Sequence, residues 1–165
     1  MSFALRDFQR IVVGVDGSPG SIAALRFAAD QVRGGRAEVL AVHAWQSAVH
    51  TPETLAAEHE EALGRLNSFV AAAELPADVE LRTETVAGPA GPALTRSADR
   101  QGDLLVIGAP APRRRLLPRR SVSRFCLARA ACPVLAVPAD SRVSRAPEAV
   151  IDQHSPSVPS PRAAA

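Results

Sequence analysis

Two short segments carry residue types that are typical of nucleoside and phosphate binding. Asp16-Gly17-Ser18 follows an apolar, β-branched run, and Gly108 follows a second such run and leads through a loop to Ser121. A carboxylate accepts hydrogen bonds from a base or a ribose, and a glycine-containing loop that enters a helix N-terminus offers backbone amides to phosphate. Together the two segments predict a nucleotide pocket if the fold brings them close.

The loop between Gly108 and Ser121 is rich in arginine. Residues 104–139 contain no Asp or Glu, and their seven arginines are Arg113, Arg114, Arg115, Arg119, Arg120, Arg124 and Arg129. A guanidinium group is always charged and fits phosphate oxygens, so an anion is the natural partner of this segment. The alternative is a solvated surface loop. Prolines 110, 112 and 118 lack an N–H group, which weakens any cradle of backbone amides.

The chain lacks the motifs of the common enzyme classes. It has no lysine, so a G-x-x-x-x-G-K-[ST] loop is excluded, and G-x-S-x-G, H-E-x-x-H and C-x-x-C are also missing. The four histidines and the two cysteines do not have metal-ligand spacing. We therefore expect a protein that is not an enzyme and has no metal. We expect His43 to be a satisfied core histidine and Cys126 to be a buried, inert thiol.

Strand-like and helix-like segments alternate along the chain. Apolar or alternating runs predict strands at residues 10–15, 37–45, 79–86, 103–108 and 134–137. Helical spacing of apolar residues predicts helices at 21–33, 53–75, 93–100 and 121–129. Parallel neighbours need crossover connections, so this order predicts an α/β fold with a doubly wound, mainly parallel five-stranded sheet flanked by helices. The strand at 79–86 is expected at an edge of the sheet.

The predicted fold also places the candidate pocket. In an open parallel sheet, ligands bind beyond the carboxyl ends of the strands, where the strand order reverses. Two predicted strands end at Asp16 and Gly108, so we expect those ends to be neighbours. The alternative role of Asp16, and of Ser121 and Ser123, is to cap the helices that follow them.

Length and composition favour one domain with flanking segments. The 165 residues are 47% hydrophobic and 22% charged, which suffices for a single buried core. We assign 1–9 to a lead-in, 10–138 to the domain, and 139–165 to a disordered tail in which Pro, Ser, Arg and Ala dominate. The apolar runs are far shorter than the ~18–20 residues that span a bilayer. We expect no membrane contact and a cytoplasmic location.

Several of these segments resemble the universal stress protein family, and the resemblance covers roughly residues 8–138. They are Ile11-Val12-Val13-Gly14-Val15-Asp16-Gly17-Ser18, Leu40-Ala41-Val42-His43-Ala44, Asp103-Leu104-Leu105-Val106-Ile107-Gly108, Ser121-Val122-Ser123 and Cys132-Pro133-Val134-Leu135-Ala136-Val137. The resemblance implies an α/β domain that commonly dimerises and that binds ATP in one branch of the family.

The ATP-binding branch has a G-x2-G-x9-G motif followed by Ser or Thr, and this chain departs from it. Gly108 matches the first glycine, but Ala111 stands at the second and Arg120 replaces the third, in a loop one residue shorter. The resemblance implies that Asp16 faces the adenosine and that Ala44 contacts the adenine. The candidate site residues are Asp16, Ala44, Ile107, Gly108, Arg113, Arg120, Ser121, Val122 and Ser123.

Three functional hypotheses follow. The first is a non-enzymatic stress-response or regulatory module that acts as a homodimer through the strand at 134–137, because an apolar edge strand pairs readily with a copy of itself. The second is a sensor of ATP, AMP or another adenine nucleotide in which arginines replace the missing glycines. The third is weak nucleic-acid binding through residues 113–129, where Phe125 is the one aromatic side chain available for base stacking.

Overall fold

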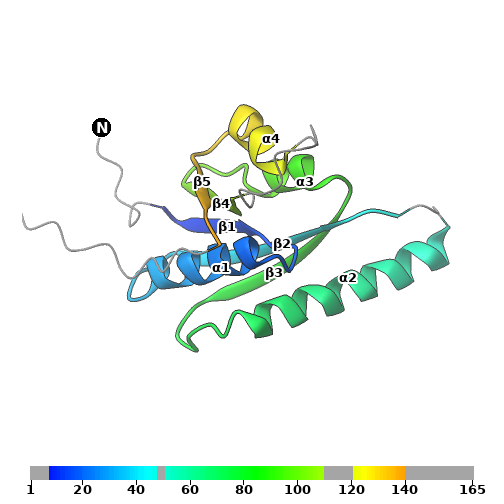
Figure 1. Cartoon of the computed structure of the whole chain (residues 1–165), viewed down its shortest axis with the longest axis horizontal. Helices are drawn as coiled ribbons and strands as arrows, with labels where there is room; N and C mark the ends of the chain where they lie inside the picture. The colour runs from blue at the N-terminus through cyan, green and yellow to red at the C-terminus, as the bar shows by residue number, and fades with distance from the viewer. Residues whose placement is uncertain (1–7, 48–50, 110–120, 140–165) are drawn as a thin grey trace, which may run out of the picture.

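The computed structural model describes residues 8–47, 51–109 and 121–139, in which strands and helices alternate (Figure 1). The elements in chain order are β1 (Arg10–Gly14), α1 (Pro19–Val32), β2 (Glu38–Trp45), α2 (Pro52–Ala72), β3 (Leu81–Ala87), α3 (Ala90–Ser97), β4 (Asp103–Gly108), α4 (Val122–Arg129) and β5 (Val134–Val137). The strands form one sheet in the order β3-β2-β1-β4-β5, and every neighbouring pair is parallel. The predicted α/β fold is confirmed.

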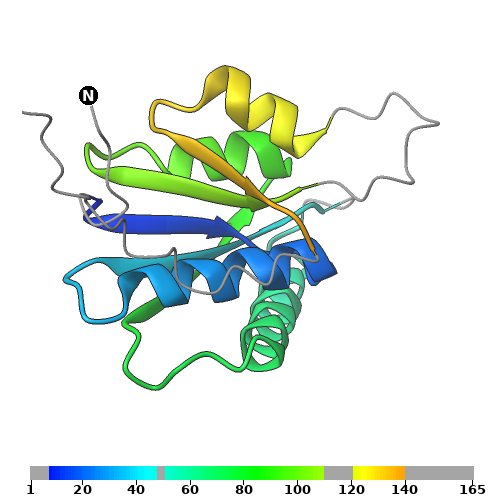
Figure 2. The same cartoon turned by 60° about the vertical axis from the view of Figure 1, so that its left-hand side comes forward.

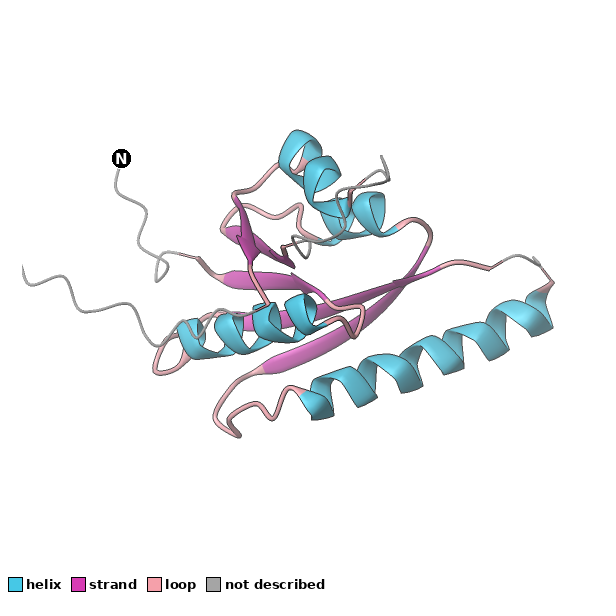
Figure 3. Ribbon diagram, in the orientation of Figure 1, coloured by secondary structure: helices cyan, strands magenta, loops and turns pink. Residues whose placement is uncertain are grey.

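The helices cover both faces of the sheet. Figure 2 shows α1 and α2 on one side of the strands and α3 and α4 on the other, and Figure 3 shows the strand layer between them. The chain thus winds twice: it moves outward from β1 to β3, then returns to β4 and continues to β5. The strand order reverses between β1 and β4, which are hydrogen-bonded neighbours.

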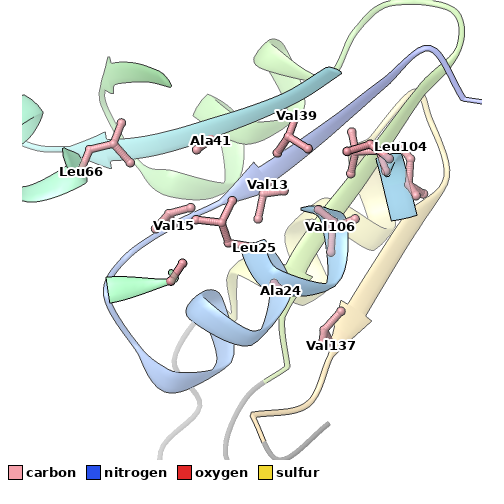
Figure 4. Packing of buried hydrophobic residues seen from close by; sticks show 14 residues of the cluster. Val13, Val15, Ala24, Leu25, Val39, Ala41, Leu66, Leu104, Val106 and Val137 are labelled. Atoms are coloured by element: carbon pink, nitrogen blue, oxygen red, sulfur yellow. The ribbon is translucent and has the colours of Figure 1, made fainter. Parts of the chain in front are cut away.

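Each face of the sheet has its own hydrophobic core. Alternate β1 side chains point in opposite directions: Ile11 and Val13 pack toward α1 and α2, whereas Val12 packs toward α3 and α4, and all three are completely buried. Figure 4 shows part of the first core, in which Leu25 of α1 lies close to Val13. Burial on both faces explains why β1 and β4 are apolar without alternation.

The start of α1 differs from the prediction. The helix begins at Pro19 rather than residue 21, and Ser18 is its N-cap, because the Ser18 Oγ accepts a hydrogen bond from the Ser21 N–H at 3.2 Å. The Asp16 carboxylate instead accepts from the Ser18 N–H at 2.9 Å. The alternative reading of Asp16 as the helix cap is therefore wrong; Asp16 stabilises the turn before the cap.

Two further boundaries shift in the region rich in proline and glycine. The third helix begins at Ala90, three residues before the predicted start, because Pro92 lies in its first turn, where a missing N–H costs nothing. The third strand covers Leu81–Ala87 rather than 79–86. It lies at the edge of the sheet, as expected.

Some expectations fall outside the described residues. These are the arginine-rich loop, with Arg113 and Arg120, and most of the lead-in and tail. Within the described ranges, none of the helices combines the length and the apolar character needed to cross a bilayer.

A buried ion pair ties the amino ends of β1 and β4 together. Arg10 donates from Nε to Asp103 Oδ1 at 2.9 Å and from a terminal nitrogen to Oδ2 at 2.7 Å, and the two side chains are 9% and 1% exposed. Arg10 also donates to the carbonyl of Ser97, and Asp103 accepts from the Arg100 N–H. The pair therefore links two strands to the end of α3 and the loop after it.

Asp103→Asn should lower the free energy of unfolding by about 3–5 kcal/mol, because the Arg10 charge would stay buried without its counter-ion. Urea denaturation measures this change. Arg65→Ala is the matched control: it breaks an exposed pair with Glu61 and should change stability by less than about 1 kcal/mol. Equal effects of the two variants would contradict the structural role of the buried pair.

The carboxyl end of β4 meets the first turn of α1 backbone to backbone. A Cβ atom on Gly108 would lie 2.6 Å from the carbonyl carbon of Gly20 and 2.7 Å from the nitrogen of Ser21. A Cβ on Gly20 would lie 3.2 Å from the carbonyl oxygen of Ala109. The missing side chain of Gly108 lets this strand and this helix approach so closely.

Gly108→Ala should therefore cost about 1–3 kcal/mol of unfolding free energy, because the added methyl group meets rigid backbone. Gly64→Ala in the exposed middle of α2 provides the opposite control. A Cβ there meets nothing within 4 Å, and alanine should raise stability by up to about 1 kcal/mol. Thermal unfolding of both variants distinguishes a packing role of Gly108 from a general effect of glycine removal.

Candidate functional site

A pocket lies at the point where the strand order reverses, beyond the carboxyl ends of β1, β2 and β4. The first residues of α1, α3 and α4 close its other sides. Its lining residues are Gly14, Val15, Asp16, Ser18, Ser21, Val42, Ala44, Ala90, Leu94, Ile107, Gly108, Val122 and Ser123. This is the position at which doubly wound folds bind their ligands.

The pocket brings together six of the predicted site residues. Four come from the turn after β1 and from strands, and two come from α4; they are Asp16, Ala44, Ile107, Gly108, Val122 and Ser123. Ser121 is the N-cap residue of α4 beside the pocket. Arg113 and Arg120 lie outside the described residues, so the proposed exchange of arginine for glycine stays a prediction.

Seven further residues line the pocket. Ser18 belongs to the predicted Asp16-Gly17-Ser18 segment, and the six that were not predicted are Gly14, Val15, Ser21, Val42, Ala90 and Leu94. Gly14 and Val42 precede Asp16 and Ala44 by two positions, and the period of two along a strand places such pairs on the same face. That signal was available. Ala90 and Leu94 were missed because the start of α3 was predicted three residues too late.

The Asp16 carboxylate is held in place by the turn around it. Its Oδ1 accepts from the Ser18 N–H, while its own N–H donates to the Ser21 Oγ at 3.2 Å. Burial raises the pKa of Asp16, but the hydrogen bonds from Ser18 and Ser21 outweigh it, so the pKa lies below its ordinary value. Asp16 is therefore a fixed carboxylate at neutral pH, suited to accept hydrogen bonds from a ligand.

The N-termini of three helices border the pocket. The first turns of α1, α3 and α4 all border it, and none of the three carries an acidic residue. Unpaired N–H groups and the helix dipole favour an anion at such positions. Ser121 at the N-cap of α4 makes no side-chain capping bond. Ser121 thus occupies the predicted N-cap position, but its side chain does not form the expected capping hydrogen bond.

The described walls enclose a cavity of about 100 Å³ that opens to solvent. Ligand pockets commonly measure ~300–1,000 Å³, so these walls fit part of a nucleotide rather than the whole molecule. Val15, Val42, Ala44 and Ile107 supply apolar surface on the strand side, and Leu94 of α3 adds to it from the helix side. The polar side chains lie in the turn after β1 and at the starts of α1 and α4; they are Asp16, Ser18, Ser21 and Ser123.

Other titratable groups have structural surroundings. His43 is 9% exposed and its Nδ1 lies 2.8 Å from the carbonyl oxygen of Val15, which confirms the satisfied core histidine. Cys126 is buried, and burial together with Cys132 raises its pKa to about 11, as an inert thiol requires. The described part of the chain holds no group of three or more His, Cys, Asp or Glu side chains that could bind a metal.

The fold is shared with solved universal stress proteins. A universal stress protein in complex with cAMP is 28% identical, with a TM-score of 0.58 over 81% of this chain and 98% of that one. UspA from Lactobacillus plantarum is 24% identical, with a TM-score of 0.56 over 79% of this chain and 97% of that one.

A universal stress protein from Archaeoglobus fulgidus in complex with dAMP is also 24% identical, with a TM-score of 0.54 over 79% of this chain and 98% of that one. No curated protein matches this chain. The model of the universal stress protein family matches residues 7–138, which span all the described strands and helices. The chain belongs to the universal stress protein family.

Proposed function

We propose that this protein is a non-enzymatic, cytoplasmic regulatory module that binds an adenine nucleotide in the pocket at the β1–β4 switch point. One observation carries the proposal: a fixed carboxylate, an apolar strand wall and three helix N-termini border the same cavity. Each suits a different part of the ligand. The carboxylate accepts from a ribose hydroxyl or an adenine amine, the apolar wall packs on the base, and the helix ends favour phosphate.

The relatives with bound nucleotides support the choice of ligand class. The 28% identical universal stress protein was solved with cAMP, and the Archaeoglobus fulgidus protein with dAMP. The proposal prefers AMP-like ligands to longer phosphate chains. Only the first glycine of the ATP motif is present in the sequence, and glycine is the residue that lets backbone amides approach a phosphate closely.

The described pocket supports binding better than catalysis. Asp16 is the one titratable side chain among its lining residues. Its pKa lies below the ordinary value, which makes the carboxylate a weak base at neutral pH. The free thiols Cys126 and Cys132 agree with a reducing compartment such as the cytoplasm.

Calorimetric titration with AMP, cAMP and ATP tests this proposal directly. We expect AMP or cAMP to bind with a dissociation constant below about 1 mM, which corresponds to about −4.1 kcal/mol. Ser123→Asp should weaken that binding at least about tenfold, because it places a negative charge at the α4 N-terminus, where the phosphate is expected.

Asn67→Asp is the matched control for that experiment. Asn67 is exposed on α2 and does not line the pocket, so the variant adds the same charge elsewhere. Asn67→Asp should bind as the unmodified protein does. No heat from any of the three nucleotides at millimolar concentration, or equal weakening by both variants, would contradict nucleotide binding at this pocket.

The second part of the proposal is a homodimer through the free edge of β5. Among the described strands, β5 pairs only with β4. The N–H groups of Leu105 and Ala109 donate to the carbonyls of Pro133 and Val137, so the alternation of a parallel ladder directs the Ala136 N–H toward the open edge. Ala136 is exposed there, within an apolar strand.

Ala136→Pro should therefore yield a folded monomer, because proline removes an outward N–H group and is tolerated on an edge strand. Sedimentation equilibrium at micromolar concentrations measures the change, and the unmodified protein should be dimeric. Thr83→Pro is the control, because it removes an N–H group from β3 at the opposite edge of the sheet. This variant should stay dimeric. A monomeric unmodified protein, or a dimer that persists in Ala136→Pro, would contradict pairing through β5.

A further inference from the structure

The turn that carries Asp16 has one side on the pocket and the other on the core of the α1–α2 face. Asp16 and Ser18 line the pocket, and Val15 both lines it and belongs to the core cluster. The hydrogen bonds within the turn fix its local shape. They do not fix its position relative to β2 and α2, so contacts from those elements must set where Asp16 lies.

The first contacts come from β2, where the backbone carbonyl of Val42 accepts from the Val15 N–H at 2.8 Å and the side chain of His43 reaches the other side of the same residue. The Nδ1 atom of His43 lies 2.8 Å from the carbonyl oxygen of Val15, the residue directly before Asp16. A carbonyl only accepts, so Nδ1 carries the hydrogen and donates it. His43 is 9% exposed, and a buried hydrogen bond of this kind is costly to lose because the carbonyl would stay without a partner.

The second contact comes from α2. The ring of Phe69 meets the His43 ring edge to face, with centroids 5.6 Å apart and an interplanar angle of 77°. The same ring supports Gly17, the residue directly after Asp16: a Cβ on Gly17 would lie 2.7 Å from Cζ of Phe69. Gly17 has φ +79°, so glycine is required here by both conformation and space.

We infer that His43 and Phe69 are positioning residues for the nucleotide site. They anchor the backbone on either side of Asp16, His43 at Val15 and Phe69 at Gly17, and so hold the carboxylate at the pocket although neither residue lines it. The ligand-binding half of this inference rests on the proposed function. The position of the turn can be measured without any ligand.

The test uses two replacements of His43 that differ in one property. In His43→Asn the side-chain amide can reach the place of Nδ1 and donate to the Val15 carbonyl, whereas His43→Leu keeps the volume and removes the donor. His59→Asn and His59→Leu are the matched controls, because His59 is the exposed histidine of α2 and bonds to Thr85 rather than to the turn.

Two readouts are compared at a temperature where all variants are folded. We expect His43→Leu to bind AMP roughly tenfold more weakly than the unmodified protein, and His43→Asn to recover most of that affinity. By NMR, the Ser18 and Ser21 amides should shift and exchange faster in His43→Leu but not in His43→Asn. The amide of Val106 in β4 reports global stability and should change far less.

Phe69→Leu gives an independent variant if His43→Leu does not fold, and it should shift the Gly17 and Ser18 amides. The inference is overturned if His43→Leu leaves the turn amides unchanged, or if His43→Asn behaves as His43→Leu does. It is also overturned if the His59 variants cause the same changes. If the unmodified protein binds no adenine nucleotide, only the proposed function is contradicted. The comparison of amide shifts and exchange rates still tests whether His43 positions the turn.

Discussion

The arrangement of the whole site depends on the close approach of β4 to the first turn of α1. Gly108 and Gly20 meet there without side chains, and a methyl group on Gly108 would enter the backbone of the helix. This contact sets how far the α1 N-terminus stands from the end of β4 and so fixes the width of the pocket between them. Gly108, the first glycine of the family motif, is thus required for packing whether or not a ligand is bound.

Strands and helices contribute different kinds of surface to the pocket. The strands β1, β2 and β4 supply rigid apolar walls, because their central residues are buried on both faces of the sheet. The helices supply N–H groups at their first turns, which carry no acidic residue, and Asp16 in the turn before α1 is the one carboxylate that lines the pocket. At the opposite end of the sheet, the Arg10–Asp103 pair holds β1 and β4 together. The two contacts lie at opposite ends of β4, where Asp103 pairs with Arg10 of β1 and Gly108 packs against α1.

The sequence predicts the sheet better than it predicts the details of the site. Alternating strands and helices leave few topologies open, so the parallel order and the neighbouring ends of β1 and β4 could be predicted. The packing of Phe69 against Gly17 could not be predicted. That contact joins residues distant in sequence, and spacing along the chain does not show which distant residues meet. The Ser18 cap and the start of α3 instead follow local signals, a Ser-Pro step and a proline in the first helical turn, that the predicted boundaries did not use.

The two edges of the sheet have opposite character, which bears on how copies of the chain can assemble. The β5 edge is short and apolar, whereas the β3 edge exposes Arg82, Thr83 and Glu84 beside the charged Glu80. Charged side chains on an edge strand discourage further strands from adding. In the proposed dimer, two copies paired through their β5 edges would leave a charged β3 edge at each outer border of the joined sheet, and such edges oppose the addition of further strands that fibril growth requires.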